Sequence, residues 1–391
     1  MSDLLTVHSF SFPTAIRLGA GVRHSAHGAL HARGCKRPLI VTDRGMKDLP
    51  FIAEMKNHLS AGNASVDLFA GIYGNPVASQ LDAGVAAYKA HDADAIVAIG
   101  GGATLDVAKL IALMAHHPGS VFDYEDGKPD GRPVDREIPF IIAIPTTAGT
   151  GSEVGRSAVI SDDITHAKKI IFSPRLLPAL VLADPELLLG LPAIMTAATG
   201  MDAVTHLIEA YLAKGFHPMC DGIALEGLKL MSRSLGVATE CAQNKEGATV
   251  AHLTARTETL MGSLMGAVAF QKGLGVIHSC AHAMSTVADI HHGTANAVML
   301  PAGLAFNLPV VGDRMADLAR SVGAHSASGL IDWVRETRHD LGLPGSLPDV
   351  GIGEDRLPAL VAVAMNDGCH PCNVRPVSAD DFYHIFKASC A

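Results

Sequence analysis

DAIVAIGGGATLDVAK, residues 94–109, joins an apolar run that predicts a buried β-strand to a pattern that predicts a helix. Three glycines at 100–102 stand between the two and allow a tight turn. The N–H groups and the dipole at the start of such a helix favour a phosphate group. The stretch matches neither G-x-G-x-x-G nor the P-loop pattern, so an ordinary strand-to-helix turn is the alternative interpretation.

Strand-like and helix-like segments alternate on both sides of this stretch. Before it, strands are predicted at RPLIVTD (37–43) and SVDLFAG (65–71), with helices near residues 47–60 and 77–90. Strands separated by helices of this length favour parallel βαβ units. Four more strand-like runs follow, and we expect one mixed sheet to hold them: PFIIAIPTT (139–147), SAVISD (157–162), KKIIFS (168–173) and ALVLAD (179–184).

The pattern changes near residues 185–190, where prolines punctuate the chain. The sequence therefore predicts the α/β plus all-α class, with an α/β domain at 1–187 and a helical domain at 188–391. Ligands of an open α/β sheet bind at the carboxyl ends of its strands, so we expect a crevice there that the helical domain closes. Apolar residues at i, i+3 and i+4 predict the helices in three segments: 193–213, 219–235 and 248–270.

Composition excludes several classes of partner. The chain has 391 residues, 48% hydrophobic and 18% charged, and a formal net charge of -9. It lacks the basic surface that nucleic acid or an anionic membrane needs, so neither partner is expected. No signal-peptide pattern and no apolar run of ~18 residues is found, which predicts a cytoplasmic protein. Seven scattered cysteines predict reduced thiols, and CHPC at 369–372 has no second CxxC.

Two further features fit a dinucleotide cofactor. PTTAGTGSE, residues 145–153, is a loop rich in hydroxyl groups and glycine at the end of another predicted strand, and two such loops suit a pyrophosphate. Asp43 ends the first clear strand, where a carboxylate can accept hydrogen bonds from a ribose diol. A helix N-cap is the alternative role for Asp43. No G-x-S-x-G elbow is present, which argues against a hydrolase.

The helical half carries aspartate and histidine in metal-ligand patterns. Asp202 and His206 lie four residues apart and share one face of a predicted helix, and His278 and His282 repeat this spacing. Two more histidines follow at 291–292. A single pair of this kind is usually a surface ion pair. One aspartate and three histidines that converge on a divalent cation would satisfy histidines in so apolar a context, and this ligand set suits iron or zinc.

Taken together, these segments resemble the iron-containing (group III) alcohol dehydrogenase family from about residue 10 to the C-terminus. The resemblance implies a dehydroquinate-synthase-like fold: a Rossmann-like dinucleotide-binding domain, an all-helical metal-binding domain, and an active site in the cleft between them. It also implies a homo-oligomer, at least a dimer, in which SFSFPTAIRLG (9–19) could pair strands between subunits. The matching stretches are GNP (74–76), AIGGGATLDVAK (98–109), PTTAGTGSE (145–153), ADPELLLGLP (183–192), TAATGMDAVTHLIEAY (196–211), GLGVIHSCAH (273–282) and HHGTANAVMLP (291–301).

The resemblance implies roles for individual residues. Asp43 would repel a 2'-phosphate, which favours NAD over NADP. Ala103, Gly155 and Val374 depart from the usual Ser, Thr and Pro of the family. The metal ligands would be Asp202, His206, His278 and His292. The residues that contact the cofactor would be Asp43, Asn75, Gly101, Gly102, Ala103, Asp106, Thr146, Thr147, Thr150 and Lys169, with Asp106 supporting the glycine loop.

The same resemblance implies a mechanism. A divalent metal, Fe(II) in preference to Zn(II) or another divalent ion, would bind the oxygen of a small primary alcohol or aldehyde as a Lewis acid. Hydride would pass between this substrate and NAD. His282, one helical turn after His278, would relay the alcohol proton, with an orienting or structural role as the alternative.

Three other functions stay open at this point. One is the reduction of a polar or anionic short aldehyde, such as a sulfo-, phosphono- or hydroxy-aldehyde. Another is the reduction of maleylacetate, although reductases of that kind usually lack the Asp/His set. The third is a catalytically silent regulatory protein that binds nucleotide or metal, which intact ligands disfavour. The substrate itself is not fixed by the sequence, because the pocket candidates Phe270, Gln271, His282 and 367–376 mix apolar and polar types.

Overall fold

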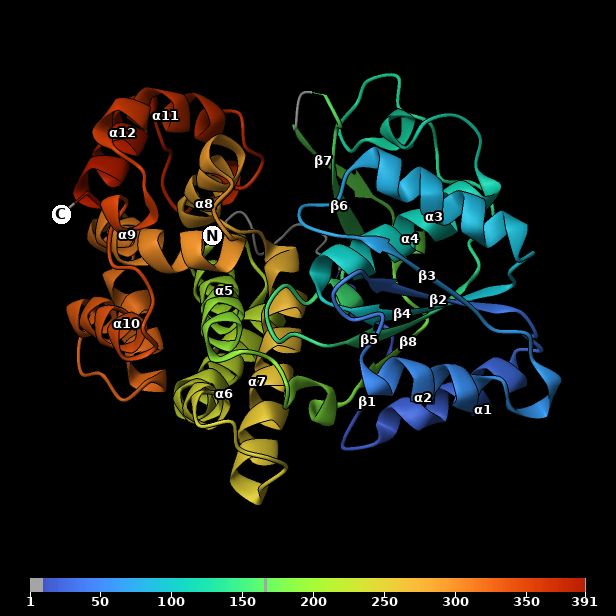
Figure 1. The fold of residues 1–391 in the computed structure, drawn as a ribbon. Helices are drawn as coiled ribbons and strands as arrows, with labels where there is room; N and C mark the ends of the chain where they lie inside the picture. The colour runs from blue at the N-terminus through green and yellow to red at the C-terminus, as the bar shows by residue number, and fades with distance from the viewer. Residues whose placement is uncertain (1–9, 165–166, 391) are drawn as a thin grey trace. The chain divides into compact units, whose positions relative to one another are not determined.

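A computed structural model describes residues 10–164 and 167–390 (Figure 1). The chain divides into two compact units. The sheet unit consists of Pro13–Thr147 and Ser152–Leu188. The helical unit consists of the described residues from Leu189 onward, the loop Ala148–Gly151 and residues 10–12. The two predicted architectures, an α/β half and a helical half, are both confirmed.

The sheet unit is built on a six-stranded parallel sheet. Alternate residues of its buried strands enter two different cores, as the twofold repeat of a strand requires: Leu39 faces one core and Ile40 the other. Helices on both faces bury the sheet, so its central strands read as continuous apolar runs. The strands, in spatial order, are β1 (Ala15–Leu18), β8 (Leu180–Ala183), β5 (Phe140–Pro145), β4 (Ala95–Gly100), β2 (Pro38–Asp43) and β3 (Asp67–Ile72).

The prediction of one mixed sheet is wrong. The segments β6 (Ser157–Ser161) and β7 (Lys168–Phe172) form a separate antiparallel pair. The reason is the short connection between them, because two strands joined by a few residues can pair directly and antiparallel, whereas a parallel pairing needs a long crossover. The Val159 amide of β6 donates to Asp106, 2.9 Å away, which ties this pair to the helix after β4.

Four helices cover the sheet. Figure 1 shows one pair on each face, and the residues of the two cores agree with this arrangement. The residues of β2 and β4 that face α3 and α4 belong to one core, and those that face α1 and α2 belong to the other. The helices are α1 (Ser25–Ala32), α2 (Pro50–Leu59), α3 (Ala78–Ala90) and α4 (Gly102–His116).

The helical unit packs around α5 (Ala193–Leu212), in which every residue from Thr196 to the end is buried. A helix that is apolar on nearly all sides belongs in the centre of a bundle, which is where its neighbours hold it. The helix predicted at 219–235 continues to Gln243, and the helix predicted at 248–270 ends at Ala269. The surrounding helices are α6 (Pro218–Gln243), α7 (Val250–Ala269), α8 (Val276–Ala288), α9 (His292–Ser321), α10 (Ala327–Asp340), α11 (Leu357–Met365) and α12 (Ala379–Ala388).

Helix α9 is long and apolar enough, by length and composition, to cross a membrane. Its apolar window is 61% buried within the protein, which is the pattern of a core helix. Two prolines, Pro301 and Pro309, lie inside it, and the backbone at Val311 leaves helical geometry just after the second. We therefore read α9 as the kinked core helix of this unit.

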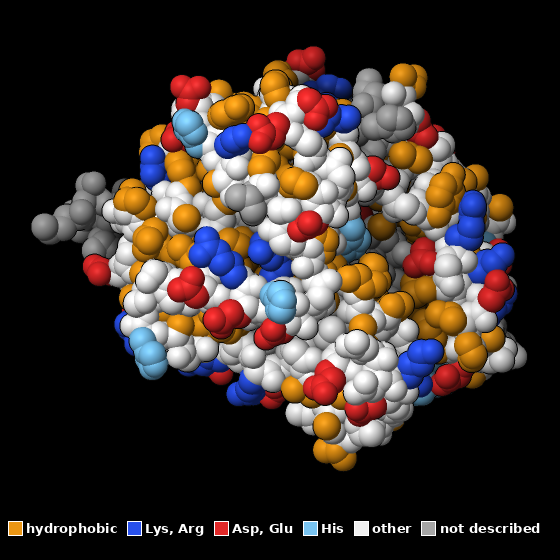
Figure 2. Space-filling view, turned by 60° about the vertical axis from the view of Figure 1, so that its left-hand side comes forward, with side chains coloured by type: hydrophobic (Ala, Val, Ile, Leu, Met, Phe, Trp, Pro, Cys, Tyr) orange, Lys and Arg blue, Asp and Glu red, His pale blue; other side chains and the backbone are white. Residues whose placement is uncertain are grey.

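The surface and the thiols agree with the composition. Figure 2 shows acidic and basic side chains interspersed over the face it presents. All seven cysteines are free thiols. The first nine residues, on which the prediction of a missing signal peptide rests, lie outside the described part of the chain. Of the segment 9–19, the residues Ala15–Leu18 pair with β8 of the same chain and form an edge strand of the sheet.

Candidate active site

One buried carboxylate oxygen lies at the centre of a group of histidines in the helical unit. Asp202 and His206 sit one turn apart on α5 and are 2% and 4% exposed. The Nε2 atom of His206 is 3.8 Å from Oδ1 of Asp202. Helix α8 adds His278, whose Nε2 is 3.7 Å from the same oxygen, and the first residue of α9 adds His292, whose Nε2 is 3.4 Å from it. The structure thus brings all four predicted metal ligands together.

Glu209, three residues after His206, holds His278 in one orientation. Its Oε2 lies 2.6 Å from Nδ1 of His278 and accepts the His278 amide at 3.1 Å, while its Oε1 accepts the Ile277 amide at 2.7 Å. A carboxylate only accepts, so Nδ1 of His278 carries the proton. The Nε2 atom of His278 is then the nitrogen that faces Asp202, and a metal that binds there would take the place of its proton.

Burial and charge together show that this group suits a cation. Burial raises the pKa of Asp202, but the surrounding histidines outweigh it and hold this pKa well below its usual range. Burial lowers the pKa of His206 to about 4 although Asp202 opposes it, so His206 is neutral and can offer a lone pair. Burial also lowers the pKa of His278, but Asp202 and Glu209 outweigh it and raise it to about 9. A buried carboxylate ringed by imidazole nitrogens fits a divalent transition metal.

The ligand atoms lie close enough to share one ion. Asp202, His206 and His278 each offer an atom, and these atoms lie within 4.8 Å of one another. Asn296, one turn after His292, donates from Nδ2 to Oδ1 of Asp202 at 2.7 Å, and the same nitrogen is 3.2 Å from Nε2 of His292. Sequence analysis did not select Glu209 or Asn296, although both stand at the i+3 or i+4 spacing from a predicted ligand.

His282 pairs with an aspartate that sequence analysis did not single out. Its Nδ1 lies 2.7 Å from Oδ2 of Asp367, and the other oxygen of Asp367 accepts from Ser279 Oγ at 2.6 Å and from the Cys369 amide at 2.9 Å. The ring of His282 stacks on that of His292, with centroids 5.1 Å apart. Asp367 therefore fixes the ring, and the proton on Nδ1 leaves Nε2 as the nitrogen that can accept another.

The glycine-rich segment of the sheet unit has the predicted local form. Gly101 is the N-cap of α4 and lacks a side chain to cap the first N–H groups of that helix. Gly102 and Ala103 begin the helix, so their amides lie at its positive end. Thr147 approaches closely, because a Cβ on Gly101 would lie 3.3 Å from its Oγ1. The amide of Thr146 donates to the Gly100 carbonyl at 3.0 Å, which joins the ends of two neighbouring strands.

Asp43 and Asn75 lie in loops after strands of the same sheet. Asp43 ends β2, and its Oδ1 accepts the Met46 amide at 3.0 Å, which closes a turn. The alternative role as a helix N-cap does not hold, because α2 begins at Pro50 with Leu49 as its N-cap. Asn75 lies between β3 and α3.

Three other predicted cofactor residues have different surroundings. The carboxylate of Asp106 accepts from Ser152 Oγ at 2.5 Å and from the Val159 amide, and it lies 3.3 Å from Lys109 Nζ. It thus ties α4 to the loop at Ser152 and to β6, and this, not the glycine loop, is its observed contact. The ammonium of Lys169 is paired with Glu125 at 2.8 Å. Thr150 belongs to the loop Ala148–Gly151 of the helical unit.

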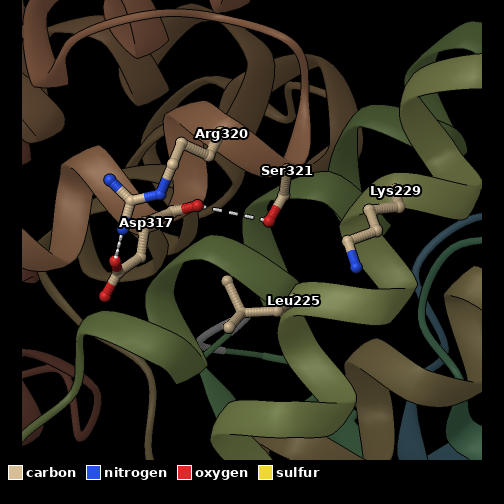
Figure 3. A pocket seen from close by; sticks show the side chains of 5 residues that line it. All are labelled: Leu225, Lys229, Asp317, Arg320 and Ser321. Atoms are coloured by element: carbon tan, nitrogen blue, oxygen red, sulfur yellow. Dashed lines mark hydrogen bonds and ion pairs between the residues drawn. The ribbon is translucent and has the colours of Figure 1, made fainter.

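A separate hollow lies between α6 and α9 (Figure 3). It is lined by Leu225 and Lys229 of α6 and by Asp317, Arg320 and Ser321 of α9. Figure 3 shows Asp317 bonded to both of its neighbours on α9. None of the predicted site residues lines this hollow.

Comparison with known proteins identifies the class that this fold and site define. Residues 13–185 match the family model for iron-containing alcohol dehydrogenase, and residues 196–390 match the C-terminal model of the same family. The chain belongs to the iron-containing alcohol dehydrogenase family, as its motifs predicted.

Individual relatives span almost the whole chain. A 4-hydroxybutyrate dehydrogenase from Cupriavidus necator is 39% identical over 369 residues, which are 91% of this chain and 93% of that protein. The crystal structure of a 1,3-propanediol oxidoreductase is 31% identical, covers 98% of this chain and 100% of its own, and superposes with a TM-score of 0.92. A sulfoacetaldehyde reductase from Bifidobacterium kashiwanohense in complex with NAD+ is 25% identical, covers 99% of both chains and has a TM-score of 0.89.

Proposed function

We propose that this protein transfers hydride between NAD and a short primary alcohol or aldehyde, with a divalent metal at the Asp202 group. The observation that carries the proposal is the arrangement of three Nε2 atoms within 3.8 Å of one buried carboxylate oxygen. A carboxylate buried among imidazole nitrogens favours a positive charge beside it, which a divalent metal would supply. A catalytically silent regulatory protein would not need both this group of ligands and His282, a further histidine that can accept a proton.

Asp202, His206, His278 and His292 would hold the metal, with Fe(II) preferred and Zn(II) or another divalent ion as the alternative. Bound there, the metal supplies Lewis-acid chemistry to the oxygen of an alcohol or carbonyl group. Glu209 keeps the His278 ring in the orientation that directs Nε2 inward. Asn296 restrains Asp202 by donating to Oδ1.

We assign the transfer of the alcohol's hydroxyl proton to His282. With Nδ1–H donated to Asp367, its Nε2 can take the hydroxyl proton when an alcohol is oxidised and return it when an aldehyde is reduced. The side chain is 27% exposed, so the proton can leave to solvent. The stacking on His292 places this acid/base group next to a proposed ligand.

The sheet unit would bind the cofactor. The uncapped first turn of α4, with Gly101, Gly102 and Ala103, suits the pyrophosphate, and Thr146 and Thr147 follow the adjacent strand. Asp43 would accept from the ribose 2'-OH and repel a 2'-phosphate, which favours NAD. The NAD+ complex of the sulfoacetaldehyde reductase supports this choice. Asn75, Asp106, Thr150 and Lys169 complete the proposed set, with Asp106 holding the loop at Ser152.

The relatives support a short substrate with a polar group at its far end. A 4-hydroxybutyrate dehydrogenase and a 1,3-propanediol oxidoreductase both carry such substrates in their names. An anionic group at that end, a carboxylate or a sulfonate, is the narrower candidate, because the names of two relatives give 4-hydroxybutyrate and sulfoacetaldehyde. We further propose two domains, at 1–187 and 188–391. The protein would be cytoplasmic, without nucleic-acid or membrane partners. It would form a dimer in which the edge strand β1 pairs between subunits.

The test is NADH formation by anaerobic, Fe(II)-loaded protein with NAD and a panel of short primary alcohols, diols and ω-hydroxy acids. We expect turnover that falls on removal of the metal and is lost in Asp202→Ala. The control is Asp340→Ala, whose side chain is exposed. Unchanged activity in Asp202→Ala would overturn the metal assignment, and turnover with none of the alcohols or the matching aldehydes would overturn the function.

A further inference from the structure

A second set of potential metal ligands lies beside the proposed proton-transfer residue. His282, Asp367 and Cys369 each offer one ligand atom, and the three atoms lie within 4.8 Å of one another. The set shares no residue with Asp202, His206 and His278, which form the other such group among the described residues. Its members are half-buried, whereas the first group is fully buried, so an ion can reach it from solvent.

The contacts of Asp367 hold these donors in place. Its Oδ2 faces Nδ1 of His282 at 2.7 Å, and its Oδ1 accepts from Ser279 Oγ and from the Cys369 amide. The ligand atom of the Cys369 thiol lies within 4.8 Å of those of His282 and Asp367. An imidazole N–H and a thiol S–H thus stand beside a single carboxylate. A divalent cation can replace both protons, because nitrogen, oxygen and sulfur atoms are all ligands for zinc.

We propose that His282, Asp367 and Cys369 form a second divalent-metal site, which takes zinc or a similarly thiophilic ion and inhibits the enzyme. A thiolate selects such ions over harder ones, and the set of four proposed for the first site contains no sulfur. Three protein ligands leave the fourth position of a tetrahedral ion to water.

Binding at this site releases one proton. The S–H bond of Cys369 breaks, its proton goes to solvent, and a metal–sulfur bond forms. The Nδ1 atom of His282 exchanges its proton for the metal, and the neutral ring carries its proton on Nε2 instead. No electron moves. With Nε2 protonated, His282 can no longer accept the proton of an alcohol, so inhibition follows; this last step rests on the proposed function, but the binding does not.

Cobalt(II) titration of the metal-stripped protein tests the binding. Cobalt in the Asp202 group gives no sulfur-to-cobalt charge transfer, because that group lacks a thiolate. We expect a near-ultraviolet charge-transfer band as the titration proceeds beyond the first equivalent, and we expect Cys369→Ser to lose it. The matched control is Cys372→Ser, which removes the other thiol of the same turn, one that packs against Gly273 and lies outside the set.

The second arm is inhibition of the Fe(II)-loaded enzyme by added Zn(II), each variant being compared with its own activity without zinc. We expect inhibition to be at least about tenfold weaker in Cys369→Ser than in Cys372→Ser, the scale on which groups around a metal affect its binding. Cys369→Ala replaces Cys369→Ser if thermal unfolding shows that the serine variant is misfolded. A titration without a sulfur band, or a band that persists without Cys369, overturns the proposal. The spectrum decides this even if no alcohol is turned over, so failure of the proposed function remains distinguishable.

Discussion

Glu209→Gln is the substitution that tests most directly how the chain orients a proposed metal ligand. Glu209 accepts three N–H groups: the amides of Ile277 and His278, and Nδ1 of the His278 ring. Glutamine has the same shape but only one acceptor oxygen and no charge. The NH2 of the glutamine amide then takes the place of one carboxylate oxygen and faces a donor N–H. Whichever way the amide turns, at least one buried N–H group loses its acceptor.

Two independent estimates of the cost agree. A buried hydrogen bond to a charged group contributes about 1.5–3 kcal/mol, and leaving its partner unsatisfied adds to the loss. Removing a group that orients a metal-ligating histidine typically weakens metal binding by about 10- to 100-fold, which is about 1.4–2.8 kcal/mol. We therefore expect Glu209→Gln to weaken the binding of Zn(II) or Co(II) by about 10- to 100-fold.

The assay is competition between the protein and a chelator of known affinity. Glu258→Gln is the control, because Glu258 lies in the same unit and pairs with Arg233 at the surface, where an ion pair contributes little. Unfolding of both variants without metal separates a general loss of stability from a loss of metal affinity. If Glu209→Gln holds metal within about twofold of the unchanged protein, Glu209 does not orient His278 for a metal.

Three further outcomes are expected. Gly293→Ala should weaken metal binding and lower stability by about 1–3 kcal/mol, because the added Cβ would lie 2.1 Å from the Ala198 carbonyl oxygen and push the first turn of α9 away. The control is Gly312→Ala on the same helix, where a Cβ meets nothing within 4 Å and neither effect is expected. Chelator competition measures the metal binding of both variants, and thermal unfolding measures their stability. Burial raises the pKa of Glu153 to about 7, above its ordinary 4.5, so the folded protein favours the neutral form and the free energy of unfolding falls as the pH rises through this range. Relative to Glu153→Gln, the free energy of unfolding should fall by roughly 2 kcal/mol between about pH 5.5 and about pH 8. A difference between the two proteins that does not change with pH would contradict this prediction. Asp43→Ser should raise the ratio of kcat/KM for NADP to that for NAD at least about tenfold, and an unchanged ratio would show that Asp43 does not face the ribose.

The sequence predicts the elements of the sheet unit better than their pairing. Runs such as PFIIAIPTT and SAVISD are correctly identified as strands, because β-branched residues between turn signals are a local property. Their neighbours are decided by connections and by packing. The pair β6 and β7 leaves the sheet because a short connection lets the two strands bond to each other, and because Asp106 of α4 bonds to the Val159 amide.

The candidate metal ligands were accessible to sequence reasoning for a similar reason. Spacing places Asp202 and His206 on one helix face. The meeting of α5, α8 and α9 was inferred from the apolar context of the histidines, and the resemblance to a family then gave the four ligands. Glu209 and Asn296 could have been found by extending the same spacing by one turn. Asp367 could not, because it lies 85 residues from His282, and no local pattern joins the two.

The segment that contains Asp367 explains how the two histidines of α8 are held together. At its start, Asp367 bonds to Ser279 and His282 in the middle of the helix. At its end, Asn373 accepts the Val276 amide at the first turn, at 3.4 Å, and exchanges hydrogen bonds with Asn307 of α9.

The sequence resemblance also implies a departure from the family pattern in this segment, at Val374 in place of a proline. The contacts of this segment with α8 and α9 do not need that proline. Asn373 Nδ2 donates to the carbonyl of Arg375 at 2.9 Å, and the Arg375 guanidinium donates to the Phe306 carbonyl at 3.0 Å. Both bonds fix the backbone around position 374 without the ring of a proline. The positions of His278 and His282 are therefore supported by residues about 90 positions further along the chain, and we expect the chemistry proposed for α8 to require that the C-terminal segment is packed against it.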